Sequence, residues 1–277
     1  MTAVPETHRA SLTEPAAAPS RWLHPPDAEP DAAVRLFLFH HSGGSVTAFH
    51  DWFGQLPSDI CAQAVQLPGR QERRPERPYT RLAPLVDTVT EVLSADLDER
   101  PYAVFGHSMG ALLAYRAAVV LQSRGRPPAL LAVSGWSPEG FRGLATGRPS
   151  EESALTAMRR LGGLPAQVGD DPDMLAAVAQ AMAADSAVCL DYEDDAAAVD
   201  CPVVAYAGRD DPLLEPGAMR AWAGRTPRYL GCRVFPEGHF FIRSQVPAIA
   251  ADLVQLLRRH TADPQPTRET SHAARTE

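Results

Sequence analysis

The sequence contains no lysine, and all 26 basic residues among its 277 are arginine. The chain can therefore hold neither the lysine of a phosphate-binding P-loop nor a lysine Schiff base. Its net charge of -8 also gives no indication of a nucleic-acid partner. The composition thus excludes P-loop nucleotide binding and Schiff-base catalysis and gives no support for nucleic-acid binding.

Cysteine is scarce as well. Cys61, Cys189, Cys201 and Cys232 lie far apart, form no C-x-x-C pair and mostly fall in apolar surroundings. This pattern indicates reduced, buried thiols rather than a disulfide framework or a redox pair. No apolar run approaches the ~20 residues of a membrane span, and the N-terminus lacks the apolar core of a signal peptide. We therefore expect a cytoplasmic protein that binds no membrane.

The chain reads as one domain between two tails. Residues 1–32 and 261–277 are rich in small, polar and proline residues, which predicts disorder. Between them, in residues 33–260, short apolar strands alternate with helical segments. Strands are expected at 34–39, 60–67, 102–105, 129–134, 203–207 and 230–235, and helices at 83–97, 111–122 and 245–258. Such alternation predicts an α/β fold with a mainly parallel sheet covered on both faces.

One section interrupts the alternation. Residues 142–195 show no strand pattern, and helical patches occupy 152–161 and 172–191. An all-helical insertion between two core strands is the position expected for a lid over an active site. A helical subdomain with a purely structural role is the alternative.

The clearest motif lies at residues 102–122. A short apolar strand leads into Gly106-His107-Ser108-Met109-Gly110, and a helical pattern follows directly. Strand, G-x-S-x-G and helix in this order are typical of a nucleophile elbow, which displays Ser108 at the carboxyl end of a strand. Gly106 and Gly110 are required to be small because strand and helix pass close together there. The alternative is a glycine-rich turn with a capping serine, since chance gives roughly 0.1 such pentapeptides in a chain of this length.

A serine nucleophile needs a base and an acid. Elbow-type hydrolases carry them in the chain order Ser, Asp or Glu, then His. His239 fits because it sits in a loop between the last strand and the last helix, whereas the two later histidines lie at the end of that helix and in the tail. The acid follows the strand at 203–207, where Asp211 is favoured and the adjacent Asp210 remains an alternative.

The tetrahedral intermediate of acyl transfer needs two backbone N–H donors. One is expected from Met109, the residue after the nucleophile. The other is expected from Ser42, in the loop that follows the first core strand and that is made flexible by Gly43 and Gly44. The neighbouring His40 and His41 could suggest a metal pair, but no H-E-x-x-H or other ligand cluster accompanies them. We expect no metal and no organic cofactor, because the triad alone supplies the chemistry.

Six motifs occur in order within residues 35–258. They are Phe-His-His-Ser-Gly-Gly-Ser (39–45), Leu-Pro-Gly-Arg (67–70), Gly-His-Ser-Met-Gly (106–110), Leu-Gly-Gly-Leu-Pro (161–165), Gly-Arg-Asp-Asp-Pro (208–212) and Gly-His-Phe-Phe (238–241). Together they resemble the type II thioesterases encoded with polyketide synthases and nonribosomal peptide synthetases. The resemblance implies an α/β-hydrolase fold with a helical lid. It also implies that Ser108, Asp211 and His239 form the triad and that Ser42 belongs to the oxyanion loop.

The resemblance further implies a function and a partner. Such enzymes hydrolyse acyl groups stalled as thioesters on the phosphopantetheine arm of an acyl or peptidyl carrier protein. We expect a monomer. The sequence departs from the family pattern where the oxyanion loop usually reads Phe-Pro-His-Ala-Gly-Gly, since His40 and Ser42 replace proline and alanine. It departs again in the lid, where Met182-Ala-Ala-Asp185 stands for the usual Leu-Arg-Ala-Asp.

Other interpretations stay open. A carboxylesterase or an acyltransferase acting on small free acyl substrates would use the same triad, and a non-catalytic binding module is an alternative of another class. The arginine-rich stretch 70–81 suggests a docking surface for an acidic carrier protein, with a solvated loop as the plainer explanation. Arg73 and Arg74 are the residues on which that docking hypothesis depends.

Overall fold

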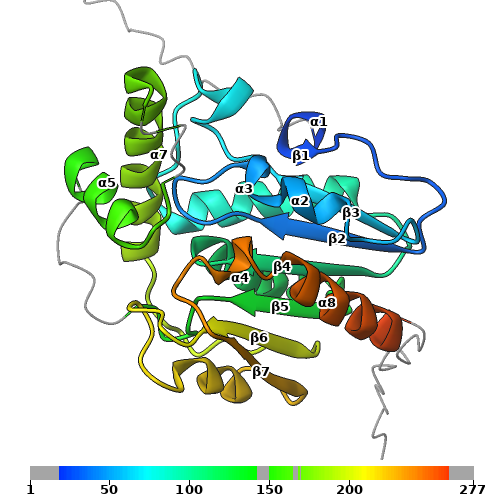
Figure 1. Ribbon diagram of the computed structural model, residues 1–277. Coiled ribbons are helices and arrows are strands. Elements are labelled where there is room, and N and C mark those ends of the chain that lie inside the picture. The colour runs from blue at the N-terminus through cyan, green and yellow to red at the C-terminus, as the bar shows by residue number, and fades with distance from the viewer. Residues whose placement is uncertain (1–18, 142–149, 165–167, 169, 262–277) are drawn as a thin grey trace, which may run out of the picture.

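The computed structural model describes residues 19–141, 150–164, 168 and 170–261 (Figure 1). A seven-stranded sheet with the order β1-β3-β2-β4-β5-β6-β7 forms its centre. The strands are β1 (Leu23–His24), β2 (Val34–Phe39), β3 (Ile60–Val65), β4 (Tyr102–His107), β5 (Leu130–Ser134), β6 (Val203–Gly208) and β7 (Tyr229–Phe235). All neighbouring strands run parallel except β1, which pairs antiparallel with β3.

The longer helices are α3 (Leu82–Asp96), α4 (Met109–Ser123), α5 (Glu151–Arg160), α7 (Pro172–Leu190) and α8 (Val246–Thr261). Shorter ones are α1 (Pro19–Trp22) and α2 (His50–Phe53), with 3-10 turns η1 (Val46–Phe49), η2 (Gln71–Arg73), η3 (Ala218–Gly224) and η4 (Phe241–Arg243). Every strand and helix expected in the core is present at its expected place. The predicted α/β-hydrolase class, with its mainly parallel sheet, is confirmed.

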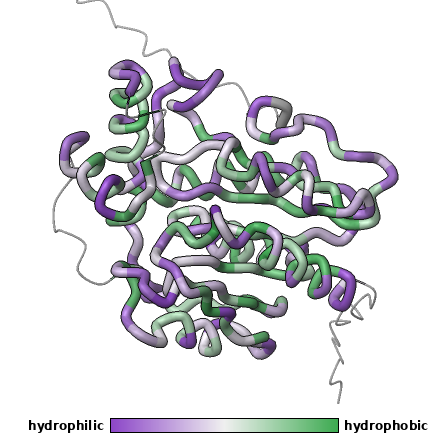
Figure 2. Tube along the Cα trace, in the orientation of Figure 1, coloured by the Kyte–Doolittle hydropathy of each residue, from purple (hydrophilic) through white to green (hydrophobic). Residues whose placement is uncertain are grey.

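Strands β2 to β6 are buried on both faces of the sheet, which explains why they read as largely continuous apolar runs. Along β2, Phe37 and Phe39 belong to the core cluster that includes α3 and α4. The alternate residues Leu36 and Leu38 belong to the opposite cluster, which includes α2 and α8. Figure 2 shows the apolar residues gathered along the central strands and on the helix sides that cover them.

The parallel strands bring the predicted site residues to one edge of the sheet. The loops after β2, β4, β6 and β7 carry the oxyanion motif, Ser108, Asp211 and His239 in turn. Because parallel strands share a direction, the loops at their carboxyl ends meet at the same edge. The helices α5 and α7 lie beyond this edge, where the arrowheads of Figure 1 point. The helical insertion therefore occupies the position predicted for a lid, although its residues 142–149, 165–167 and 169 lie outside the described part.

The predicted disorder of residues 1–32 is wrong from residue 19 onward. The helix α1 and the strand β1 cover one edge of the sheet, where Leu23 pairs with Val65. Trp22 is 3% exposed, and the Arg73 guanidinium lies 4.1 Å from the centre of its ring. Burial of two large apolar residues, Trp22 and Leu23, is thus enough to hold this segment against the sheet, although its overall composition is that of a disordered tail. Residues 1–18 and 262–277, also predicted to be disordered, are outside the described range.

One described helix, α7, is long and apolar enough to cross a membrane by length and composition. On that criterion alone, the expectation that no run approaches a membrane span is wrong. The helix nevertheless packs against α5, and its residue Asp185 is buried at 2% exposure. A helix packed within a soluble protein passes the same test.

The docked N-terminal segment leads to a stability prediction. Trp22→Ala should lower the free energy of unfolding by about 3–5 kcal/mol, because it removes a buried indole and leaves a cavity. His24→Ala is the matched control, since His24 lies two residues further on, in β1, is exposed and should change stability by only about 0.5 kcal/mol. Urea unfolding of the full chain measures both. Equal, small effects would show that the segment contributes no stability.

Candidate active site

The turn between β4 and α4 holds Ser108 in an unusual backbone conformation. Its φ is 57° and its ψ is -124°, far from the regions that L residues normally occupy. The Ser108 amide donates to the Ser134 carbonyl at 2.7 Å, and its carbonyl accepts from the Ala111 amide at 2.8 Å. These bonds hold a strained residue in place, which is a feature that clusters at functional sites.

Gly106 and Gly110 make this turn possible. A Cβ atom on Gly106 would lie 2.0 Å from the Gly110 carbonyl oxygen. A Cβ atom on Gly110 would lie 2.1 Å from the carbonyl oxygen of Phe39, at the end of β2. Both contacts are with backbone, so neither could relax by a side-chain movement. The predicted reason for these two glycines is therefore visible in the structure.

Ser108, His239 and Asp211 lie in one hydrogen-bonded chain. The Ser108 Oγ is 3.0 Å from His239 Nε2, and His239 Nδ1 is 2.7 Å from Asp211 Oδ2. The other Asp211 oxygen accepts from the Leu213 amide at 2.9 Å, which fixes the carboxylate. All three residues are at most 5% exposed. This is the arrangement in which a serine can pass its proton to an imidazole oriented by an acid.

The structure distinguishes the two aspartates that the sequence left open. Asp211 is buried and faces His239, whereas Asp210 is exposed. Within the described residues, the Asp210 carboxylate makes no hydrogen bond, and only its amide is used, to the Glu237 carbonyl at 3.0 Å. Of the two, only Asp211 is placed to orient the imidazole.

Two backbone amides near Ser108 are free to bind an anion. Across the described part of the chain, neither the Ser42 amide nor the Met109 amide donates a hydrogen bond. The next amide in the loop, that of Gly43, is already occupied by Asp185 Oδ2 at 2.8 Å. Gly43 has a φ of +69° and Gly44 would have a Cβ atom 2.9 Å from the His41 carbonyl oxygen, so the loop needs glycine at both positions.

Two further histidines, His41 and His107, lie near the triad without joining it, and His40 is buried next to His41. The ring of His107 lies 5.0 Å from that of His239, and the ring of His41 lies 6.3 Å from that of His107. Burial lowers the pKa of His41 to about 4, and it holds the pKa values of His40 and His107 well below 6.5. These imidazoles are thus neutral near pH 7. Among the described residues, no three potential ligands gather as a metal site would require.

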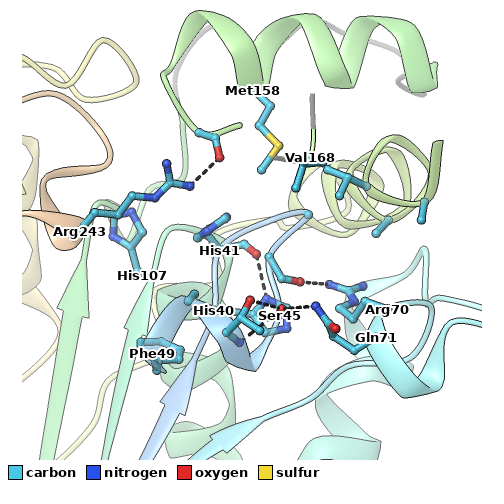
Figure 3. A pocket seen from close by; sticks show the side chains of 18 of the residues that line it. His40, His41, Ser45, Phe49, Arg70, Gln71, His107, Met158, Val168 and Arg243 are labelled. Atoms are coloured by element: carbon cyan, nitrogen blue, oxygen red, sulfur yellow. Dashed lines mark hydrogen bonds between the residues drawn. The ribbon is translucent and has the colours of Figure 1, made fainter. Parts of the chain in front are cut away.

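A cavity of about 580 Å³ lies between the lid and the sheet edge (Figure 3). It reaches the triad region at His41 and His107, while Arg70 and Gln71 line its other side. The lid supplies an apolar wall of Met158, Val168, Met174, Ala177, Val178 and Ala181. The opposite wall is polar and comes mainly from the loop after β2 and from the turn at 69–74. The cavity is therefore amphipathic and large enough for an acyl chain.

The docking hypothesis for the stretch 70–81 is wrong for two of its arginines. Arg70 is 7% exposed and pairs with Asp185, and Arg73 is 4% exposed and pairs with Glu76 at 2.6 Å. The other three arginines of this stretch, Arg74, Arg77 and Arg81, are exposed. A basic run looks like a solvated surface in sequence, but the first two of these five arginines turn inward to bind carboxylates and carbonyls.

Sequence reasoning also missed two contacts that the lid makes with the site. Asp185 of α7 reaches the oxyanion loop and Arg70, and Arg243 donates to the Gly162 carbonyl at 3.1 Å and to the Gly163 carbonyl. Arg243 also lies 4.6 Å from the Phe240 ring centre. Each of these residues lies within or beside a family motif, yet the motifs say nothing about which of them touch.

The elbow, the triad order and the parallel sheet define an α/β-hydrolase. The thioesterase domain family matches residues 34–257 of the chain, and this protein therefore belongs to the thioesterase family, an assignment that confirms the predicted resemblance. The probable cadicidin biosynthesis thioesterase of Streptomyces griseus is 33% identical over 250 residues, covering 88% of this chain and 68% of that relative.

Solved structures agree with this membership. The type II thioesterase BorB from the borrelidin biosynthetic cluster is 32% identical, with a TM-score of 0.76, covering 86% of this chain and 98% of BorB. RedJ, a thioesterase from the prodiginine biosynthetic pathway in Streptomyces coelicolor, is 35% identical, with a TM-score of 0.71, covering 83% of this chain and 90% of RedJ. The chain is thus an enzyme of the thioester-hydrolase type.

The buried histidines give a pH prediction. Because the pKa of His41 falls from 6.5 to about 4 on folding, the unfolded chain binds a proton there in that interval and the folded chain does not. The free energy of unfolding is therefore unaffected by His41 well above pH 6.5 and decreases as the pH falls below that value. At about pH 5, His41 alone should lower the free energy of unfolding by about 2 kcal/mol. Urea unfolding at about pH 7.5 and about pH 5 measures the loss. His41→Gln should show a smaller loss than the parent, and an equal loss would contradict the prediction.

Proposed function

We propose that this protein is an editing thioesterase that releases acyl groups from the phosphopantetheine arm of carrier proteins in polyketide or nonribosomal peptide biosynthesis. The observation that carries the proposal is the hydrogen-bonded chain of Ser108, His239 and Asp211 beside a lid-covered cavity. In this proposal Ser108 is the nucleophile, His239 the general base and Asp211 the residue that orients the base.

The reaction follows from these contacts. His239 Nε2 takes the hydroxyl proton as Ser108 Oγ attacks the thioester carbonyl, and Asp211 stabilises the imidazolium that forms. The amides of Ser42 and Met109 donate to the oxyanion of the tetrahedral intermediate. The carbon–sulfur bond then breaks, the pantetheine thiolate recovers the proton from His239, and an acyl-enzyme remains. Water then attacks this ester while it gives a proton to His239. The bond between the acyl carbon and Ser108 Oγ breaks, Oγ recovers that proton from His239, and the carboxylic acid is released.

The amphipathic cavity supports an acyl substrate of mixed polarity. Its apolar wall belongs to α5, α7 and the segment between them, while its polar wall belongs to the core loops. Relatives named for cadicidin, borrelidin and prodiginine biosynthesis support a carrier-bound substrate in an assembly-line pathway. We expect the enzyme to act as a monomer in the cytoplasm, without metal, organic cofactor, nucleic acid or membrane. The triad does not distinguish hydrolysis of thioesters from hydrolysis of small free esters or from acyl transfer, so substrate preference is the test.

The first test compares substrates. Release of acid from an acyl-phosphopantetheinyl carrier protein should exceed release of the same acyl group from coenzyme A and from a nitrophenyl ester, in kcat/KM. Ser108→Ala should lower kcat by about 10⁵- to 10⁶-fold, because the nucleophile is lost, while circular dichroism stays unchanged. Faster cleavage of the free ester would instead support a carboxylesterase. Full turnover by Ser108→Ala would contradict the proposed mechanism.

The second test separates the two aspartates. Asp211→Asn should lower kcat by about 10⁴-fold, because an amide beside His239 Nδ1 favours the wrong tautomer. Asp210→Asn is a matched control of identical chemistry one residue away, and it should change kcat by less than about twofold because its carboxylate is exposed. Steady-state kinetics on one acyl thioester measures both. A larger loss in Asp210→Asn would transfer the orienting role to that residue.

A further inference from the structure

One face of the lid helix α7 lies along the oxyanion loop. Met182, Asp185 and Cys189 are spaced so that they share this face. Met182 packs on Gly43 so closely that a Cβ atom on the glycine would lie 3.2 Å from it. The Cys189 Sγ is 3.7 Å from the Ser42 Oγ. The lid therefore touches the side chain of Ser42, whose amide is the proposed donor, and the next residue, Gly43.

Asp185 makes the polar contact in this row. Its Oδ2 accepts from the Gly43 amide at 2.8 Å and from Arg70 Nη1 at 2.8 Å, while its Oδ1 accepts from Arg70 Nη2 at 3.0 Å. A bidentate arginine and a backbone amide thus share one carboxylate that is 2% exposed. A charge buried to this extent is retained only when its partners are in place, so the carboxylate fixes the positions of both the Arg70 guanidinium and the Gly43 amide.

Arg70 extends the same connection. Its Nη1 also donates to the Gly44 carbonyl at 3.3 Å, and its Nε donates to the Pro68 carbonyl at 3.2 Å. The oxyanion loop is therefore held at the Gly43 amide by the lid and at the Gly44 carbonyl by Arg70. Both contacts lie within two residues of the Ser42 amide, which donates no hydrogen bond to any residue that the structure describes.

We propose that Asp185 is a positioning residue for the oxyanion hole and that it couples the seating of the lid to the placement of the Ser42 amide. The proposal rests on the proposed function, in which that amide binds the oxyanion. Asp185 accepts a hydrogen bond from the Gly43 amide, so the Ser42 amide is the one in this loop that remains to bind the substrate oxyanion. When α7 is seated over the cavity, the Asp185 carboxylate holds the loop. Without that contact, the loop loses the one backbone hydrogen bond that it makes to the lid among the described residues.

The experiment must separate positioning from stability, because Asp185→Leu alone leaves Arg70 buried and unpaired and should lower the Tm. The double variant Arg70→Met/Asp185→Leu removes both charges and should recover most of that Tm. Its kcat per active site, titrated with a fluorophosphonate, should still be about 10- to 100-fold below the parent, since a misplaced group can reduce the rate by about 10²-fold. KM should change by less than about threefold.

A second readout follows the oxyanion itself. Affinity for an acyl trifluoromethyl ketone, which forms a tetrahedral oxyanion with the serine, should weaken by about the same factor as kcat/KM. The matched control is Asp191→Ala, because Asp191 anchors the C-terminal end of α7 away from the oxyanion loop, accepting from the Leu82 amide at 2.9 Å and from Arg81 at 2.8 Å. It should leave both kcat and ketone affinity within about twofold of the parent. Should the double variant fail to fold, Asp185→Asn is judged by the same two measurements.

The outcomes distinguish the two proposals. A double variant that recovers both its Tm and its kcat would overturn the positioning role, and so would a loss in Asp191→Ala equal to that in Asp185→Leu. These results would leave the proposed thioesterase unaffected, provided that the parent releases acid from the carrier and Ser108→Ala does not. A parent without thioester hydrolysis would instead overturn the proposed function.

Discussion

The close approach of three backbones at the elbow is the constraint on which the site depends. Gly106 faces the backbone of Gly110, and Gly110 faces the Phe39 carbonyl at the end of β2. The first contact lets the chain reverse through Ser108 with a φ of 57°. The second presses the start of α4 against the strand that leads into the oxyanion loop. Ser108, the proposed nucleophile, and the predicted anion donors are therefore positioned by the same packing, and a methyl group at either glycine would separate them.

The topology of the sheet brings Asp211 and His239 to Ser108, which the local packing at the elbow cannot do. The order β2-β4-β5-β6-β7 is parallel throughout, so residues from four strand ends reach one edge. His239 and Ser108 are 131 residues apart in sequence and 3.0 Å apart in space. Asp211 needs only the turn after β6 to face the imidazole, and the Leu213 amide fixes it there. The triad thus depends on a rigid scaffold rather than on its own loops, in keeping with the precision that such chemistry requires.

The sequence predicted the features that leave a local pattern. Continuous apolar runs marked the buried strands, and G-x-S-x-G marked the elbow because its glycines are a local steric requirement. Contacts between distant charged residues leave no such pattern: Arg70 and Asp185 are 115 residues apart, and each alone reads as a surface residue. The docking of Trp22 was missed for a related reason, since composition averages over a segment in which two residues provide the burial. The sequence favoured Asp211 over the adjacent Asp210, but only burial and the contact with His239 distinguish them.

The departures from the family pattern in the oxyanion loop can be understood in the same physical terms. A proline before the loop would restrict its backbone, and here His40 stands in that place. Its Nδ1 lies 2.9 Å from the His41 carbonyl, and His41 Nδ1 lies 2.9 Å from the Ser42 carbonyl. A carbonyl only accepts, so both Nδ1 atoms carry the proton. Burial lowers the pKa of each imidazole and keeps it neutral near pH 7, and the two consecutive hydrogen bonds replace the restriction of a proline ring. The loop is thereby held from within by its histidines and from outside by the lid.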